Sequence, residues 1–137
     1  MKSHLENVAE FNQRFGVPIG DRPRELEPAD LIFRVAFMQE ELNEFLRAYL
    51  QADIVKQADA LIDLEYVLLG TALWMGLGSV WDQLHDEVHR ANMRKAPAVT
   101  KEASAENRGR GHRFDVIKPA GWVGPDITAI LRRRRDV

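Results

Sequence analysis

The sequence predicts an all-α protein, an antiparallel helical bundle whose core is completed by oligomerisation. Three long stretches carry apolar residues at helical spacing, and short segments containing glycine or proline separate them. No series of alternating apolar and polar residues indicates a β-sheet. Because the second and third of the expected helices are apolar over most of their length, we expect a second copy to cover part of that surface.

Length and composition are typical of one globular domain, and we expect a single domain over residues 1–137. The chain has 45% hydrophobic and 29% charged residues and a net charge of −2. Zero cysteines exclude a disulfide framework and a thiolate metal site. No apolar run approaches the roughly 20 residues of a membrane span, and the start lacks a secretory signal pattern, so we expect a cytoplasmic protein. The basic end "LRRRR" is interpreted as a solvated tail, and a nucleic-acid partner is not expected.

The first half of the chain is expected to contain three helices. Residues 5–15 have apolar side chains at helical spacing, and glycines and prolines then interrupt the pattern up to Pro28. The second helix is expected to start between Pro28 and Asp30 and to run to about Gln51, and the third to start between Ala52 and Ile54 and to run to about Met75. The predicted apolar stripe of the second helix comprises Leu31, Val35, Met38, Leu42, Phe45, Leu46 and Tyr49, and that of the third comprises Leu61, Leu64, Leu68 and Leu69.

The second half is expected to contain a fourth helix, a loop and a short final helix. Ser79 is a suitable N-cap for the fourth helix, which is expected to end between Lys95 and Pro97. Residues 97–112 are polar and contain glycine, which predicts a mobile loop. One or two short extended segments are expected in residues 113–125, and a helix in residues 125–134.

Acidic residues occur on the second and third helices at positions that a core would fill with apolar side chains. "MQEELNEF" contains Glu40, Glu41 and Glu44, and "ADALIDLEYVLLG" contains Asp59 and Asp63. Side chains four residues apart on a helix differ by about 40° in direction, so each cluster lies on one face. Since a short connection makes the two helices antiparallel neighbours, the two clusters are expected to face each other.

Converging carboxylates repel one another and bind protons or cations. Oxygen-only ligands without cysteine or histidine favour Mg²⁺, with Mn²⁺ as the alternative. The competing interpretation of this pattern is a solvated acidic helix face with Asp63 as a paired core acid. An acid between Ile62 and Leu64 requires a partner, so the spacing alone leaves both interpretations open.

Three segments together resemble a known superfamily. "EELNEF", "ADALIDLEYVLLGTALWMGL" and "DEVHRANMRK" are similar in order and spacing to the all-α nucleoside triphosphate pyrophosphohydrolases, which include MazG-like proteins, phosphoribosyl-ATP pyrophosphohydrolase and dimeric dUTPases. The similarity is closest to the short MazG-like branch. It covers roughly residues 5–95, with an echo in "KPAGWVGPDITAIL".

The resemblance implies a MazG-like fold and Mg²⁺-dependent cleavage between the α and β phosphates, giving a nucleoside monophosphate and pyrophosphate, as in housecleaning of the nucleotide pool. Glu41 and Glu44 match the first acidic pair of the family pattern, and Asp63 matches the last acid of the second pair. Many relatives carry Glu where this chain has Ala60, and an acid where it has Lys56. Asp59 is the candidate substitute.

The expected roles follow from this match. Glu41, Glu44, Asp59 and Asp63 are the expected metal ligands, and Glu40 or Glu41 is the expected general base. Four residues are candidate contacts to phosphate or substrate: Tyr66, Arg90, Asn92 and Lys95. Phe11, Phe15 and Trp74 are candidates for a base pocket, with Phe15 and Trp74 favoured. The nucleotide itself is not identified by the sequence, and a homodimer or higher homo-oligomer is expected.

Two alternatives remain open from the sequence. The chain is a candidate for a catalytically degenerate helical dimer that binds nucleotides or a protein, because Ala60 and Lys56 depart from the family pattern. The spacing of Asp82, His85, Asp86 and His89 is that of a transition-metal site, but a di-iron bundle needs such a motif on two helices.

Overall fold

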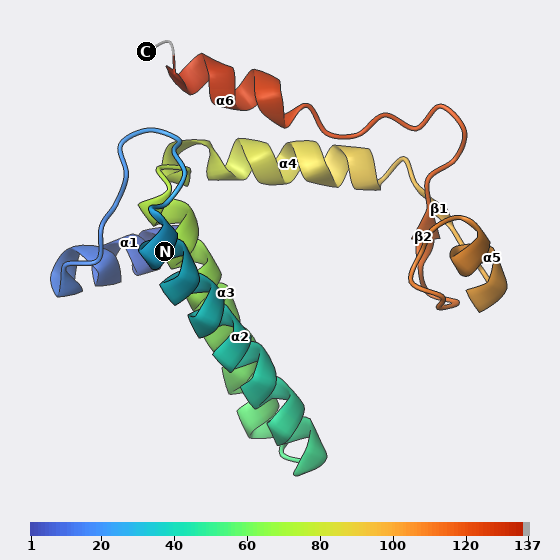
Figure 1. Ribbon diagram of the computed structural model, residues 1–137, viewed down its shortest axis with the longest axis horizontal. Helices are drawn as coiled ribbons and strands as arrows, with labels where there is room; N and C mark the ends of the chain where they lie inside the picture. The colour runs from blue at the N-terminus through green and yellow to red at the C-terminus, as the bar shows by residue number, and fades with distance from the viewer. Residues whose placement is uncertain (136–137) are drawn as a thin grey trace. The chain divides into compact units, whose positions relative to one another are not determined.

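The computed structural model describes residues 1–135, and these fold into helices with one very short strand pair (Figure 1). The all-α prediction is therefore confirmed. Contacts divide the chain into two compact units, Met1–Ser79 and Val80–Val137. That the whole chain forms one domain stays a prediction. Within the described residues no single helix is long and apolar enough to cross a membrane, although the bent pair Ile54–Trp74 and Gly78–Asn92 meets the length and composition criteria together.

In the first unit, helix α1 spans His4–Phe15 and has strong signals at both ends. Ser3 and Glu6 form a capping box, in which each side chain bonds the other residue's backbone N–H. Gly16 ends the helix in the left-handed conformation, with φ 71°. The helix contacts α3 and buries Val8 and Asn12, which lie one turn apart on one face.

Helices α2 (Pro28–Leu50) and α3 (Ile54–Trp74) form an antiparallel hairpin, seen side by side in Figure 1. Pro28 lies in the first turn of α2, where its missing N–H is not needed. Asp53 caps α3 by accepting a hydrogen bond from the Lys56 N–H. The predicted bounds of both helices agree with the structure to within one residue at their C-terminal ends.

The face that α2 turns toward its own chain differs from the predicted one. Its buried residues are Arg34, Glu41 and Ala48, which recur every seven residues and so share one side of the helix. The predicted apolar stripe stays largely accessible: Leu31, Val35, Leu42, Leu46 and Tyr49 are exposed, and Met38 and Phe45 are half-buried. A single chain therefore leaves most of the predicted stripe uncovered.

Helix α3 buries small residues as well as large ones: Ala60, Val67, Leu69, Gly70, Ala72 and Leu73. Of the predicted stripe only Leu69 is buried, whereas Leu61 and Leu68 are exposed. Small side chains allow a close approach between helices, which is the physical reason that the alanines face inward and several leucines do not.

The 3₁₀ turn η1 (Gly78–Val80) spans the boundary between the units, and helix α4 (Trp81–Asn92) is the first helix of the second unit. The prediction of Ser79 as N-cap is wrong, because the 3₁₀ turn places Val80 at that position without a side-chain hydrogen bond. Helix α4 also ends earlier than expected. Strands β1 (Ala96–Pro97) and β2 (Val116–Ile117) pair antiparallel, and α6 (Ile127–Arg135) contacts α4.

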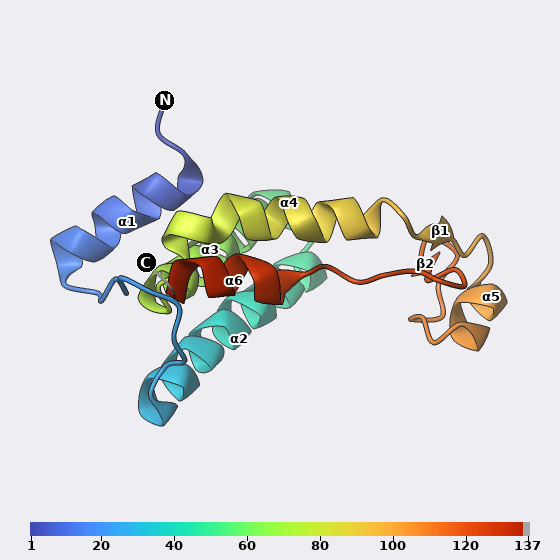
Figure 2. The same cartoon turned by 90° about the horizontal axis from the view of Figure 1, so that it is seen from above.

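The expected loop over residues 97–112 contains helix α5 (Lys101–Glu106), which the sequence prediction missed. Figure 2 shows α5 gathered with β1 and β2 beyond the end of α4. Buried Asp115 organises this segment: it accepts hydrogen bonds from the Ser104 hydroxyl and the Arg110 N–H and pairs with the Arg110 guanidinium. These bonds hold the pKa of Asp115 well below its usual range. The side chains of Arg134 and Arg135 in the basic tail lie outside the described residues.

Candidate metal centre

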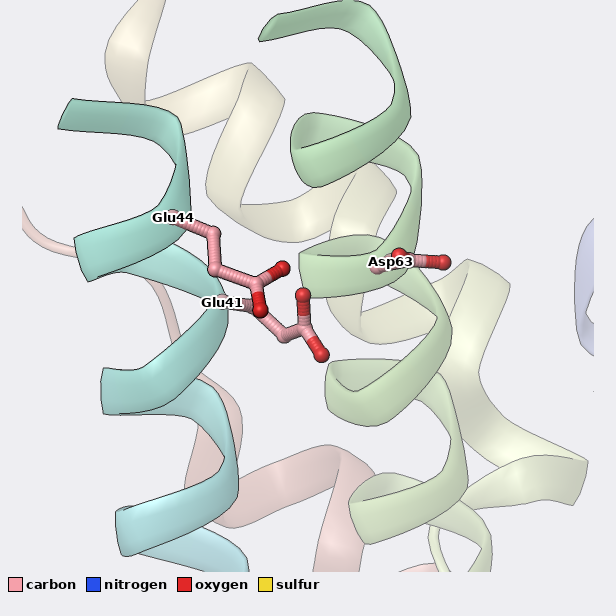
Figure 3. A group of neighbouring side chains, drawn as sticks. All are labelled: Glu41, Glu44 and Asp63. Atoms are coloured by element: carbon pink, nitrogen blue, oxygen red, sulfur yellow. The ribbon is translucent and has the colours of Figure 1, made fainter. Parts of the chain in front are cut away.

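Three carboxylates from the α2–α3 hairpin converge. One oxygen each of Glu41, Glu44 and Asp63 lies within 4.8 Å of the others. Figure 3 shows Glu41 and Glu44 extending from α2 toward α3, which carries Asp63. Glu41 is buried because it lies on the face of α2 that packs against α3, whereas Asp63 is half-buried and Glu44 is exposed. The sequence prediction that the two acidic clusters face each other agrees with this geometry.

The buried carboxylate of Glu41 lacks a compensating partner. Its Oε2 atom is inaccessible to solvent and has no hydrogen-bond partner among the described residues. Burial, with the charges of Glu44 and Asp63, raises the pKa of Glu41 to about 7. Burial, followed by the charges of Asp59 and Glu44, also raises the pKa of Asp63. An acidic group of this kind gains from binding a cation, and three carboxylate oxygens fit a hard divalent ion such as Mg²⁺.

Two other predicted acids lie outside this group. Glu40 and Asp59 are exposed, and neither belongs to the three carboxylates that converge. Both still act on the cluster through charge, because Glu40 raises the pKa of Glu41 and Asp59 raises that of Asp63. The structure therefore gives Asp59 no direct place among the converging ligands, and its predicted metal role stays a prediction.

A cavity of about 190 Å³ adjoins the acidic cluster within the first unit. Glu41 and Asp63 form part of its wall, so an ion held by the cluster would be accessible from the cavity. Its other lining residues come from α1, α2, α3 and the segment after α1: Val8, Phe11, Asn12, Val17, Arg34, Phe37, Tyr66, Val67 and Gly70.

Two polar residues of this cavity were missed by the sequence prediction. Arg34 is 5% exposed; its Nη2 donates to the Val67 carbonyl at 2.8 Å and its Nε donates to the Thr71 hydroxyl at 3.0 Å. Gly70 makes this placement possible, because a Cβ there would lie 2.7 Å from Arg34 Nη2. Asn12 is 2% exposed, and its Nδ2 has no hydrogen-bond partner among the described residues. Helical spacing could have indicated both residues, because Arg34 lies two turns before Glu41 and Asn12 lies one turn after Val8, each pair on one helix face.

Of the three aromatic candidates, Phe11 lines the cavity and the other two do not. Phe15 is exposed and contacts Phe11, with ring centroids 4.6 Å apart, while Trp74 lies against the Arg34 guanidinium at 5.9 Å. Neither Phe15 nor Trp74 belongs to the cavity lining, whereas Phe11 and Tyr66 do, in an edge-to-face pair at 5.4 Å. The structure thus favours Phe11 over Phe15 and Trp74 as the aromatic wall beside the acids.

The basic candidates belong to the second unit and have partners there. Arg90 donates to Glu87 from Nε at 2.9 Å and also pairs through Nη2. The Lys95 ammonium lies 5.3 Å from the centroid of the Trp122 ring, and Asn92 is exposed at the end of α4. The predicted phosphate contacts of Arg90, Asn92 and Lys95 stay predictions.

The histidines of the motif on α4 belong to the second unit. His85 and His89 are both exposed, and their rings stack with centroids 6.5 Å apart. Among the residues that the structure describes, the group with metal-binding geometry is that of Glu41, Glu44 and Asp63.

Comparison with known families now identifies the relationship. Residues 8–92, more than half of the chain, match the family model of phosphoribosyl-ATP pyrophosphohydrolase. The chain belongs to this family. The phosphoribosyl-ATP pyrophosphohydrolase family is part of the MazG-like all-α superfamily, so the predicted relationship is confirmed. No curated protein matches the chain significantly.

The match to the phosphoribosyl-ATP pyrophosphohydrolase family includes the residues that form the candidate site. The matched range contains α2 and α3 with all three converging acids, and it includes Asn12 of α1. It ends at Asn92, before β1, α5, β2 and α6. The chain is therefore a member of a pyrophosphohydrolase family, and its acidic cluster can hold a divalent metal.

Proposed function

We propose that the protein is a Mg²⁺-dependent nucleoside triphosphate pyrophosphohydrolase that cleaves between the α and β phosphates. The products are a nucleoside monophosphate and pyrophosphate, and Mn²⁺ is the expected substitute ion. The observation that carries this proposal is the convergence of Glu41, Glu44 and Asp63, in which a buried carboxylate oxygen has no hydrogen-bond partner among the residues that the structure describes. Family membership supports the reaction class.

The residues of the cluster fit distinct roles. Glu41, Glu44 and Asp63 hold the ion, which when bound neutralises phosphate charge and makes a nearby water molecule more acidic. Glu40 is suited to accept the proton of the attacking water, because it is exposed and adjacent to the cluster without being one of the three converging acids. Glu41 was the alternative base, but its burial among the ligands favours a role in holding the ion.

The cavity beside the cluster supports a place for the nucleoside part of the substrate. The Phe11 ring offers an apolar wall, and the Asn12 amide offers a donor and an acceptor of hydrogen bonds. Tyr66 lines the same cavity and remains our candidate for a contact to substrate. The half-buried position of Trp74 and the exposure of Phe15 support secondary roles only.

We further propose that the protein acts in the cytoplasm, in housecleaning of the nucleotide pool, as a homodimer or a higher homo-oligomer. The exposed apolar stripe of α2 supports association, since Leu31, Leu42 and Leu46 are 49%, 46% and 57% exposed in the single chain. A second copy of the chain is the expected cover for this stripe.

The test is a panel of canonical and modified nucleoside triphosphates, with phosphoribosyl-ATP added, incubated with Mg²⁺ or Mn²⁺ and analysed by chromatography. We expect monophosphate and pyrophosphate from at least one triphosphate. Glu41→Gln should abolish most turnover, whereas Glu25→Gln, an exposed acid outside the cluster, should not. Diphosphate as the main product, or no turnover of any substrate with either ion, would contradict the proposal.

One observation favours a second candidate function, a catalytically degenerate nucleotide-binding or protein-interaction dimer. Ala60 lies buried one turn before Asp63, and the structure brings only three carboxylates together among the described residues. Nucleotide binding by calorimetry without product formation in the panel would favour this alternative.

A further inference from the structure

A second hollow adjoins the acidic cluster, nearer the turn that joins α2 to α3. This groove has a volume of about 350 Å³ and is lined by Glu44, Arg47, Ala48, Gln51, Lys56, Asp59 and Ala60. Its α2 residues follow Glu41 in the sequence, whereas those of the cavity, Arg34 and Phe37, precede it. Because α2 and α3 are antiparallel, the cluster lies between the cavity and the groove along the hairpin.

The groove differs from the cavity in charge. Arg47 and Lys56 contribute two cations, and the Gln51 amide contributes a further donor. Arg47 is exposed, and Lys56 is held only by a 3.9 Å ion pair with Asp53 in which its own side chain is 67% exposed. An exposed pair of this length contributes little, so the Lys56 ammonium is available to a ligand. Ala48 and Ala60, which are buried, also line the groove, and their small side chains leave its space unfilled.

Cationic side chains near the cluster would offset negative charge that one divalent ion does not neutralise. Three converging carboxylates with one divalent ion still carry a net negative charge, and a triphosphate adds several more. The ion compensates Glu44, so the groove then presents Arg47 and Lys56 against the single acid Asp59. Anions that approach the cluster from this side therefore meet the nearest exposed positive charges of the hairpin.

We propose that this groove binds the outer phosphates of the substrate, and the pyrophosphate that leaves, through Arg47 and Lys56. The inference rests on the proposed function and adds the direction in which the substrate lies. The nucleoside part occupies the cavity with Phe11 and Asn12, the reacting phosphate lies at the cluster, and the two outer phosphates extend toward the turn. Arg47 follows Glu44 by one turn, about 4.5 Å along the helix, which is a suitable distance for the next phosphate.

The experiment measures binding of inorganic pyrophosphate by titration calorimetry in the presence of Mg²⁺, without turnover. We expect the wild-type chain to bind it. Arg47→Gln and Lys56→Met each remove one charge at nearly constant size, and each should weaken binding by roughly tenfold or more. Arg24→Gln, which removes an exposed charge of the same unit outside the groove, should change binding by less than about twofold. The same order should appear in product inhibition by pyrophosphate.

The outcomes separate this inference from the proposed function. Absence of pyrophosphate binding by the wild type, or equal affinity in wild type, Arg47→Gln and Lys56→Met, would overturn the inference. Weakened binding in these variants without hydrolysis of any triphosphate would support the groove while contradicting the reaction. Circular dichroism checks folding, and if Arg47→Gln does not fold, Lys56→Met alone decides the result because that side chain is exposed.

Discussion

Replacing Glu41 by Gln should stabilise the metal-free protein at neutral and higher pH although it removes a ligand of the proposed ion. The glutamine keeps the shape of the side chain and loses the charge that is buried between α2 and α3. Because Glu44 and Asp63 lie within 4.8 Å of Glu41 through one oxygen each, the substitution also removes repulsion from both.

The pKa of Glu41 sets the magnitude and the sign of the change in the free energy of unfolding. The ordinary value of 4.5 is raised to about 7 by burial and by the charges of Glu44 and Asp63. At about 1.36 kcal/mol per pKa unit, this difference limits the effect to about 3 kcal/mol. Between pH 4.5 and 7 the folded chain retains a proton that the unfolded chain releases, so the free energy of unfolding falls as pH rises. The decrease in the free energy of unfolding caused by Glu41 is absent below pH 4.5 and complete above pH 7.

Urea denaturation followed by circular dichroism, with a chelator present and at one protein concentration, measures the effect. The wild type and Glu41→Gln should have similar free energies of unfolding at pH 4.5, if both remain folded there, and the variant should be more stable at pH 8. The difference between the two curves isolates Glu41 from the other titrating groups. A difference that does not change across this range, or a variant that is less stable at pH 8, would refute the buried-carboxylate argument.

Three further predictions concern the same unit and its assembly. Mg²⁺ at about one hundred times its Kd should raise the free energy of unfolding by about 2.7 kcal/mol, and Asp63→Asn should reduce this gain in thermal melts; an unchanged response would remove Asp63 from the ligand set. Gly70→Ala should force the Arg34 guanidinium away from Val67, with a loss of about 1–3 kcal/mol in urea denaturation, because the new Cβ would lie 2.7 Å from Nη2; full stability would contradict the packing. Light scattering at micromolar concentration should give at least a dimer, and Leu46→Glu on the exposed stripe should shift it toward monomer, whereas a monomeric wild type would contradict the predicted association.

The helices were predictable from the sequence because their signals are local. Pro28, the Asp53 cap and Gly16 mark helix ends through backbone geometry, which depends on a few neighbouring residues. Helix α5 and the 3₁₀ turn before α4 were not predicted. Helix α5 is short, and its Ser104 hydroxyl bonds Asp115, which lies about ten residues later in the chain. The 3₁₀ turn occupies the position at which the sequence predicted a Ser79 cap.

The orientation of the helices was less predictable because periodicity does not say what a stripe faces. The spacing of apolar residues on α2 is helical, but its buried positions are Arg34, Glu41 and Ala48, and most of the stripe is exposed. A pattern of period 3.6 gives the same prediction for a face that packs within the chain and for one that packs on another copy. The small residues Ala48 and Ala60 are buried in the hairpin, yet they contribute little to a sequence pattern defined by large apolar side chains.

The candidate site was predictable where two constraints acted together. Helical spacing placed the acids on one face of each helix, and the short connection fixed the two faces opposite each other, which brought Glu41, Glu44 and Asp63 together. Arg34 and Asn12 were missed because one polar residue on an apolar face is ambiguous in sequence. Only the structure shows that both line the cavity beside the acids, and that the Asn12 amide donor has no partner within residues 1–135.

The position of the acids links the stability of the hairpin to its ligands. A core contact between α2 and α3 that contains Glu41 is weaker than an apolar one, because a buried carboxylate without a partner opposes folding. Two kinds of binding can offset this cost: a cation at the cluster, and a second chain on the exposed stripe of the same helices. Since both act on the folded hairpin, ion binding and association are each expected to stabilise the geometry that the other requires. The acids therefore occupy core-like positions because burial without a protein partner makes their affinity for a cation strong, and an acidic cluster on a solvated face would lack this driving force.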